Sequence, residues 1–184
     1  MKSVLISIQP KWCELIALGK KTVEVRKTRP KIDTPFKCYI YETKGRLQRL
    51  FQNCYDYKGK GKVIGEFVCD KIICLDEGDL LFGLDEISDS QIEEYSCLSL
   101  DELFSYKENK EFIYSWHISD LVIYDKPKEL SEFKKECKLE CDMRSLDNPP
   151  CDKCEYLVKS FGCGRIITRP PQSWCYVDHQ TEKG

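Results

Sequence analysis

The segment Gly19-Lys20-Lys21-Thr22-Val23-Glu24-Val25-Arg26 decides the fold of this chain. Gly19 is a typical end signal for a helix, and from Thr22 onwards polar and apolar residues alternate, which is the period of a β-strand. The two valines are expected to face a core, whereas Thr22, Glu24 and Arg26 share the opposite face. That face is either an ordinary solvated strand surface with ion pairs or one wall of a binding cleft.

Short strands surround this segment. Before it, Val4–Ile8 is expected to be a strand, and Pro10 is a favourable first residue for the helix that ends at Gly19. A capping box at Ser99-Leu100-Asp101-Glu102 predicts a short helix that reaches about Tyr106. Further strands are expected at Phe36–Glu42, Lys62–Leu75, Phe112–Tyr124 and Ser173–Asp178, with a turn at Asp125–Pro127. The fold class is therefore α+β: a small, mixed, partly closed β-barrel with flanking helices.

Composition limits the classes of function. The chain has 184 residues and a net charge of −2, so no global basic field attracts nucleic acid, and any such site must be a local patch. No signal-peptide pattern and no apolar stretch of about 18–20 residues occurs, so a cytoplasmic protein without membrane contact is expected. The twelve cysteines are then expected to be thiols or thiolates, not disulfides.

Cysteines cluster in residues 131–168, where a Cys-x3-Cys and a Cys-x2-Cys pair are separated by nine residues. Chance clustering or core packing would also explain them, but the spacing is typical of structural zinc sites, which four thiolates close completely. We therefore expect a barrel from residues 1–130 and 169–180, with a zinc-binding insert before the last strand. The expected zinc ligands are Cys137, Cys151, Cys154 and Cys163, with Cys141 as the alternative to Cys163.

The chain resembles the ASCH family, whose fold is similar to that of the PUA RNA-binding domain. The glycine-to-arginine segment at residues 19–26 is the specific part of the resemblance. Supporting blocks lie at Leu5–Trp12, Val63–Phe67, Trp116–Ser119 and Arg169–Val177. Together these blocks span nearly the whole chain apart from the cysteine-rich insert.

The resemblance implies a cleft between the barrel and the first helix that takes RNA or a modified nucleoside. Some family members remove the acetyl group of N4-acetylcytidine with a lysine, a threonine and a later glutamate. Lys21 matches the lysine, whereas Glu24 stands at the threonine position and Ser96 near the glutamate position. Other members are linked to RNA cleavage, which a Lys/Glu/Arg set supports by polarising a phosphate and moving a proton.

The residues themselves also favour a binding cleft. Cations pair with phosphates, aromatic rings stack on bases, and the Glu24 carboxylate accepts from an exocyclic amine. The plain alternatives are core packing for each aromatic residue and a structural role for His117. The main hypothesis is RNA or nucleotide binding; the alternatives are an enzyme with Lys21 and Glu24 as catalytic residues, or a protein-interaction module. The candidate ligand-binding residues are Trp12, Lys21, Thr22, Glu24, Arg26, Glu66, Trp116, His117, Ser173 and Trp174.

Overall fold

A computed structural model describes residues 3–45, 58–76, 78, 89–135 and 166–178. Most of the predicted insert at 131–168 lies outside the described residues, and so do all five candidate zinc ligands. No helix within the described ranges is long and apolar enough to span a membrane.

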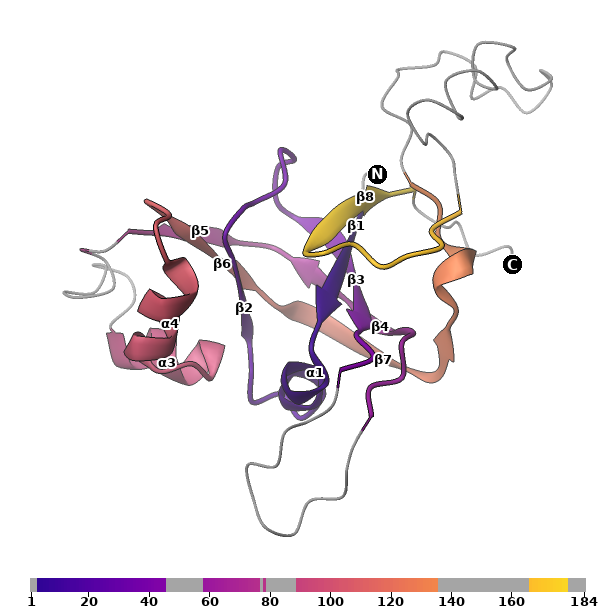
Figure 1. Ribbon diagram of the computed structural model, residues 1–184, viewed down its shortest axis with the longest axis horizontal. Coiled ribbons are helices and arrows are strands. Elements are labelled where there is room, and N and C mark those ends of the chain that lie inside the picture. The colour runs from indigo at the N-terminus through magenta and orange to yellow at the C-terminus, as the bar shows by residue number, and fades with distance from the viewer. Residues whose placement is uncertain (1–2, 46–57, 77, 79–88, 136–165, 179–184) are drawn as a thin grey trace, which may run out of the picture.

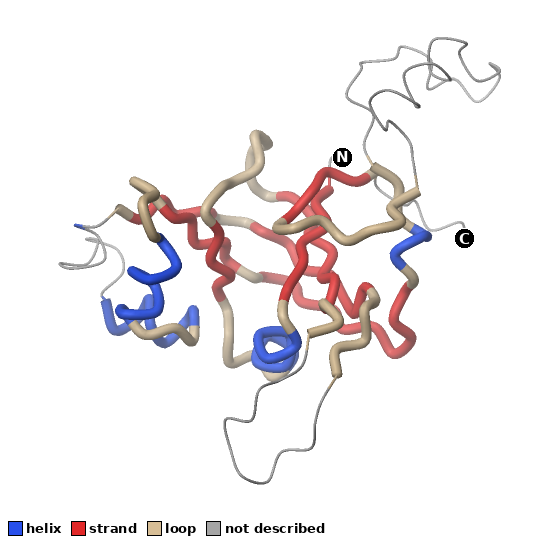
Figure 2. Tube along the Cα trace, viewed as in Figure 1, coloured by secondary structure: helices blue, strands red, loops and turns tan. Residues whose placement is uncertain are grey.

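Two β-sheets form the centre of the molecule, with the helices at its periphery (Figures 1 and 2). The larger sheet has the strand order β7 (Ser119–Lys128), β4 (Val63–Cys69), β3 (Phe36–Glu42), β1 (Ser3–Ile8) and β8 (Trp174–Val177). The smaller sheet has the order β2 (Val23–Arg26), β6 (Ile113–His117) and β5 (Ile72–Leu75). Among the described strands, β1 and β3 are the one pair that runs in parallel. The helical elements are α1 (Pro10–Ala17), α3 (Asp89–Ser96), α4 (Leu100–Lys107) and a 3-10 turn, η1 (Leu130–Glu132).

At two places the chain passes from one sheet to the other with almost no connecting loop. Only residues 70 and 71 separate β4 from β5, and only Ile118 separates β6 from β7. The long strands predicted at 62–75 and 112–124 are therefore each divided between the sheets. The turn predicted at 125–127 was wrong, because those residues continue β7.

The α+β class is confirmed, but no closed barrel is seen in the part of the chain that the structure describes. Strands β8 and β7 are the edges of the larger sheet, while β2 and β5 are the edges of the smaller one. Closure would need an edge of one sheet to pair with an edge of the other. Instead, the breaks at residues 70–71 and 118 turn the chain from one sheet into the next, so the sheets face each other across a core.

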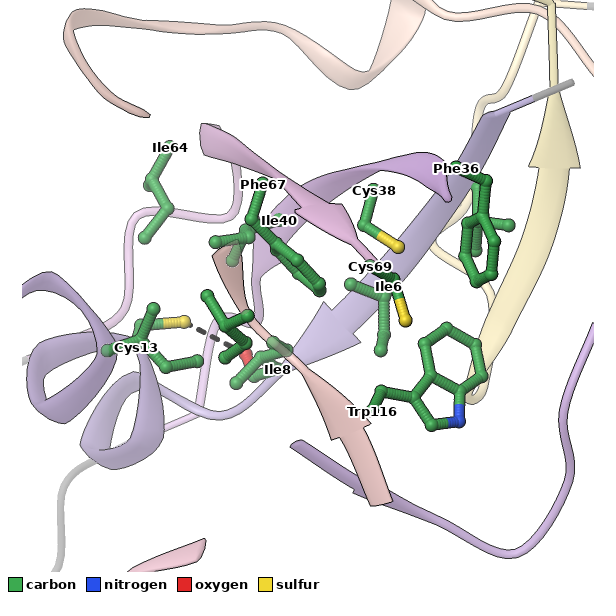
Figure 3. Packing of buried hydrophobic residues seen from close by; sticks show 13 residues of the cluster. Ile6, Ile8, Cys13, Phe36, Cys38, Ile40, Ile64, Phe67, Cys69 and Trp116 are labelled. Carbon is green, nitrogen blue, oxygen red and sulfur yellow. Dashed lines mark hydrogen bonds between the residues drawn. The ribbon is translucent and has the colours of Figure 1, made fainter. Parts of the chain in front are cut away.

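The main core lies between the two sheets. Figure 3 shows side chains of β1, β3 and β4 converging with Trp116 of β6. The Trp116 ring meets Phe36 edge-on, with ring centroids 5.9 Å apart. Cys13 from α1 joins the same cluster, and its thiol donates to the backbone carbonyl of Ile8 at 3.7 Å. Burial of these apolar side chains is the principal stabilising term of the fold.

Local signals place helices α1 and α4 as predicted. Pro10 begins α1, and Gly19 follows its end with a φ of +67°, a conformation that glycine adopts without strain. Ser99 caps α4 and forms the predicted capping box with Glu102. Helices α3 and α4 lie together at one end of the molecule (Figure 2), and the amide of Thr22 donates to the carbonyl of Tyr95 in α3 at 3.0 Å. Strand β2 is thereby held beside the helical pair.

Candidate functional site

A cavity of about 760 Å³ lies where β2, α1, α4 and the segment before β8 meet. We call it the first cavity. Lys21, Glu24 and Arg26 form one wall, and Trp12 contributes from α1. Ser173 also lines it, so the first cavity contains five of the ten residues predicted for ligand binding.

The charged residues of β2 and of the turn before it are buried, not solvated. Lys21 is 2% exposed, Glu24 3% and Arg26 9%. Glu24 and Arg26 form an ion pair, and Lys21 Nζ lies 3.5 Å from Glu24 Oε2. Alternation correctly predicts two faces for this strand, but it does not predict what covers them. The valines pack with residues of α3 and α4, whereas Arg26, on the opposite face, bonds to the carbonyl of Ser7 in β1. Two cations and one carboxylate are thus held together in a low-dielectric setting.

Backbone carbonyls take most of the remaining donors. Lys21 Nζ donates to the carbonyl of Ser96 at 2.5 Å. Arg26 donates to the carbonyl of Ser7 at 2.6 Å and to that of Val25 at 2.9 Å. Arg26 Nε is buried and has no hydrogen-bond partner within the described residues, and the nearest cation to the buried Glu24 Oε2 is the Lys21 ammonium at 3.5 Å. Buried polar atoms are normally paired, so this cluster is incompletely hydrogen-bonded within the described part of the chain.

Burial also changes the protonation chemistry of the wall. Desolvation lowers the pKa of Lys21 below the usual lysine range, and Glu24 acts in the opposite direction by stabilising the ammonium. A lysine amine of this kind is closer to the neutral form than a surface lysine. Burial has the opposite effect on the nearby Cys13 thiol, whose pKa is raised far above its usual range. Cys13 therefore stays protonated and is a core residue, not a nucleophile.

Aromatic rings of two helices line the first cavity. Trp12 is half-buried, and the ammonium groups of Lys11 and Lys21 lie 4.2 and 5.1 Å from its ring centroid. Tyr106 comes from the last turn of α4, where the Lys27 ammonium lies 5.1 Å from its ring. Sequence reasoning missed Tyr106, although its position at the end of the predicted capped helix was available as a signal.

Acidic side chains of α4 also line the first cavity. Asp101 and Glu102 lie in the first turn of this helix, and the Glu102 carboxylate accepts from the backbone amide of Ser99 at 2.9 Å. The capping box predicted from the sequence therefore also shapes one wall. Its acidic residues were not among the predicted ligand-binding residues.

The structure places Trp116 and Trp174 away from this lining. Trp116 is fully buried in the core between the sheets. Trp174 packs against Trp116 and Tyr176, and its indole nitrogen donates to the Thr28 hydroxyl at 3.0 Å. Both rings are therefore engaged by the protein's own side chains, which is the plain alternative to base stacking.

Three further predicted residues lie elsewhere. Glu66 is on β4, where it accepts from Lys37 at 2.6 Å and from Tyr124 at 2.5 Å. His117 ends β6 and its Nδ1 lies 2.7 Å from Asp70. Thr22 uses its backbone to connect α3 with residue 118. None of the three lines the first cavity.

The metal prediction concerns residues beyond those described. Within the described ranges, no group of three or more His, Cys, Asp or Glu side chains could hold a metal ion. The cysteine cluster on which the zinc prediction depends lies in residues 136–165.

Comparison with known proteins identifies the fold. No family model and no curated protein sequence matches the chain. Among solved structures, the ASCH protein of Zymomonas mobilis has a TM-score of 0.55 at 20% identity, over 96% of this chain and 87% of that one. A tyrosine-to-phenylalanine variant of that protein has a TM-score of 0.56 at 20% identity, over 97% and 91% of the two chains. A serine-to-alanine variant has a TM-score of 0.55 at 19% identity, over 96% and 88%.

These similarities extend over almost the whole of both chains. They define a mixed α+β class that is built from sheets and a few short helices. Within that class, the chain has the ASCH domain fold. The predicted resemblance to ASCH proteins is confirmed at the level of the fold.

Proposed function

We propose that the protein binds RNA or a nucleotide by accepting one base in the first cavity. The observation that carries this proposal is the buried cluster of Lys21, Glu24 and Arg26 in the wall of an open cavity. A carboxylate accepts hydrogen bonds and cationic groups donate them, and the edge of a base presents complementary groups.

The cavity also has the shape and surface expected for a base. Its volume of about 760 Å³ lies within the range of small-molecule sites. The rings of Trp12 and Tyr106 provide apolar surface on which a planar base can stack. An open cavity favours a small ligand over the alternative of a pure protein-interaction module, for which the side chains of the chain itself would fill this space.

The test compares two glutamates in the same fold. Wild-type protein, Glu24→Gln and the exposed-site control Glu14→Gln are titrated with a labelled single-stranded RNA decamer of mixed sequence and, by calorimetry, with the four ribonucleosides and N4-acetylcytidine. We expect Glu24→Gln to weaken binding about tenfold or more, because an amide cannot replace both acceptor positions of the carboxylate. Glu14→Gln should bind like the wild type. Equal binding by all three proteins would contradict the proposal.

A second candidate function is hydrolysis of a modified nucleoside or of RNA. The observation that favours it is the lowered pKa of Lys21, which lies in the cavity wall 3.5 Å from Glu24. An amine and a carboxylate in that arrangement can exchange a proton during attack of water on an acyl group or a phosphate. Release of acetate from N4-acetylcytidine by wild-type protein, abolished in Lys21→Met, would support it. If no acetate is released and no RNA is cut, binding remains as the function of the cavity.

A further inference from the structure

A second cavity, of about 530 Å³, lies next to the first. The two share Thr43, which follows β3, and the neighbouring prolines of one segment divide between them. Pro171 lines the first cavity, whereas Pro170 lines the second. The two cavities therefore adjoin at Thr43 and at this proline pair, so neighbouring groups of one ligand are the natural occupants of the two.

The first cavity is poorly suited to a phosphate. The cations in its wall are already engaged, Lys21 by Glu24 and the Ser96 carbonyl, and Arg26 by Glu24 and two backbone carbonyls. Asp101 and Glu102 add two carboxylates to the lining, so its formal charge is negative by one. An anionic group placed there would lose hydration without gaining a free cation.

The second cavity has the opposite character. Lys44 lines it, is exposed, and has no ion-pair partner among the described residues. Its one carboxylate, from Glu129, is neutralised by Lys62 at 2.6 Å. A free ammonium beside a neutralised carboxylate leaves this lining able to attract an anion.

Hydroxyl groups complete the lining of the second cavity. The residues that contribute one each are Tyr41, Thr43, Ser131 and Thr168. The Tyr41 ring is buried among apolar neighbours, and burial together with Glu129 raises the pKa of its phenol, so the hydroxyl remains a donor. Hydroxyl donors and a lysine ammonium are the groups that proteins use for sugar and phosphate oxygens.

We propose that the second cavity binds the sugar–phosphate of the nucleotide that adjoins the base held in the first cavity. The ligand is then a single-stranded oligonucleotide and not a free nucleoside. This inference rests on the proposed function, because it needs a base in the first cavity. It assigns Lys44 to the phosphate, and Tyr41 and Thr168 to sugar or phosphate oxygens.

The experiment separates the two cavities by ligand length. Affinity for the labelled RNA decamer and for the ribonucleosides is measured with wild-type protein, Lys44→Gln, Tyr41→Phe and the control Lys31→Gln, over a series of salt concentrations. Lys31 is an exposed lysine that lines neither cavity. Lys44→Gln should weaken decamer binding about three- to tenfold and reduce the slope of log affinity against log salt by about 0.7, the value for one phosphate contact on a single strand. Tyr41→Phe should weaken decamer binding at an unchanged slope.

Nucleoside binding should be unchanged in all of these variants. If Lys44→Gln and Tyr41→Phe bind the decamer like wild type while Glu24→Gln does not, the second-cavity assignment is overturned and the proposed function stands. Nucleosides that bind as tightly as the decamer also overturn the assignment. If wild-type protein binds neither probe, the proposed function fails and the assignment fails with it.

Discussion

The ammonium of Lys21 donates a 2.5 Å hydrogen bond to the backbone carbonyl of Ser96, although the two residues lie 75 positions apart in the chain. Both are buried, with exposed fractions of 2% and 0%. Lys21 immediately precedes β2, and Ser96 is the last residue of α3. The bond therefore connects the wall of the first cavity to the helical pair that covers it. In this chain the lysine is therefore bonded to the main-chain carbonyl of Ser96, which stands near the position where the family resemblance implies a glutamate.

The first prediction concerns this buried lysine. Lys21→Met should lower the free energy of unfolding by about 3 kcal/mol, because it leaves the buried Ser96 carbonyl without its donor and removes one of the two cations that pair with Glu24. Urea denaturation provides the measurement. Lys20→Met is the matched control, since Lys20 is adjacent and exposed, and it should change stability by less than about 0.5 kcal/mol.

A double-mutant cycle tests the coupling within the same cluster. Lys21→Met combined with Glu24→Gln should destabilise the protein by less than the sum of the two single variants, because each single variant removes the same Lys21–Glu24 contact. Additive effects would show that the 3.5 Å contact between Lys21 and Glu24 contributes no stability.

The second prediction concerns pH and Glu66. Burial acts to raise the pKa of this carboxyl, but hydrogen bonds from Lys37 and Tyr124 outweigh it, so the folded-state pKa lies below the ordinary glutamate value of 4.5. The stability that follows is present above pH 4.5 and is lost as pH falls through the lower, folded-state pKa. Glu66→Gln should therefore be less stable than wild type at neutral pH and show a smaller loss on acidification. Urea midpoints over a pH series measure it, with the exposed Glu94→Gln as control.

The third prediction concerns the approach of β4 to β7. A Cβ atom at Gly65 would collide with the backbone carbonyl of Val122 and crowd Ile123. We expect Gly65→Ala to cost about 1–3 kcal/mol of stability, since a paired strand cannot move away without losing its ladder. Gly19→Ala provides a comparison of a different kind. Its φ is positive but nothing lies within 4 Å of the added Cβ, so only a conformational cost of about 1 kcal/mol is expected.

The fourth prediction concerns zinc, and its basis is the sequence alone. Protein purified without chelator should contain about one zinc ion per chain by elemental analysis, and Cys151→Ser or Cys154→Ser should release it. Cys97→Ser, which lies outside the cluster, should retain the metal. Zinc retained in Cys163→Ser but not in Cys141→Ser would identify Cys141 as the fourth ligand. Absence of zinc from the wild-type protein would refute the site.

Much of the fold follows from local sequence signals. The stop at Gly19, the capping box at Ser99 and the alternation of residues 22–26 each depend on neighbours in the chain, and the structure confirms all three. The strand breaks at residues 70–71 and 118 carry no comparable signal. They arise where the chain leaves one sheet for the other, which depends on partners distant in sequence, so a single long strand was the natural prediction.

The candidate site divides in the same way. Sequence by itself determined that Glu24 and Arg26 share one face of a strand, because period two places alternate residues on one face whatever the fold, and that Lys21 stands at the entrance of that strand. Only the tertiary structure decided that this face is buried, that a carbonyl of α3 holds the lysine, and that Trp116 is engaged in the core while Trp12 and Tyr106 line the first cavity. The reason is that alternation specifies the side of the strand to which each side chain points, but not what packs over that side. Whether a polar face meets water, a helix or a cavity depends on residues 70 to 150 positions away, brought there by packing of the whole chain.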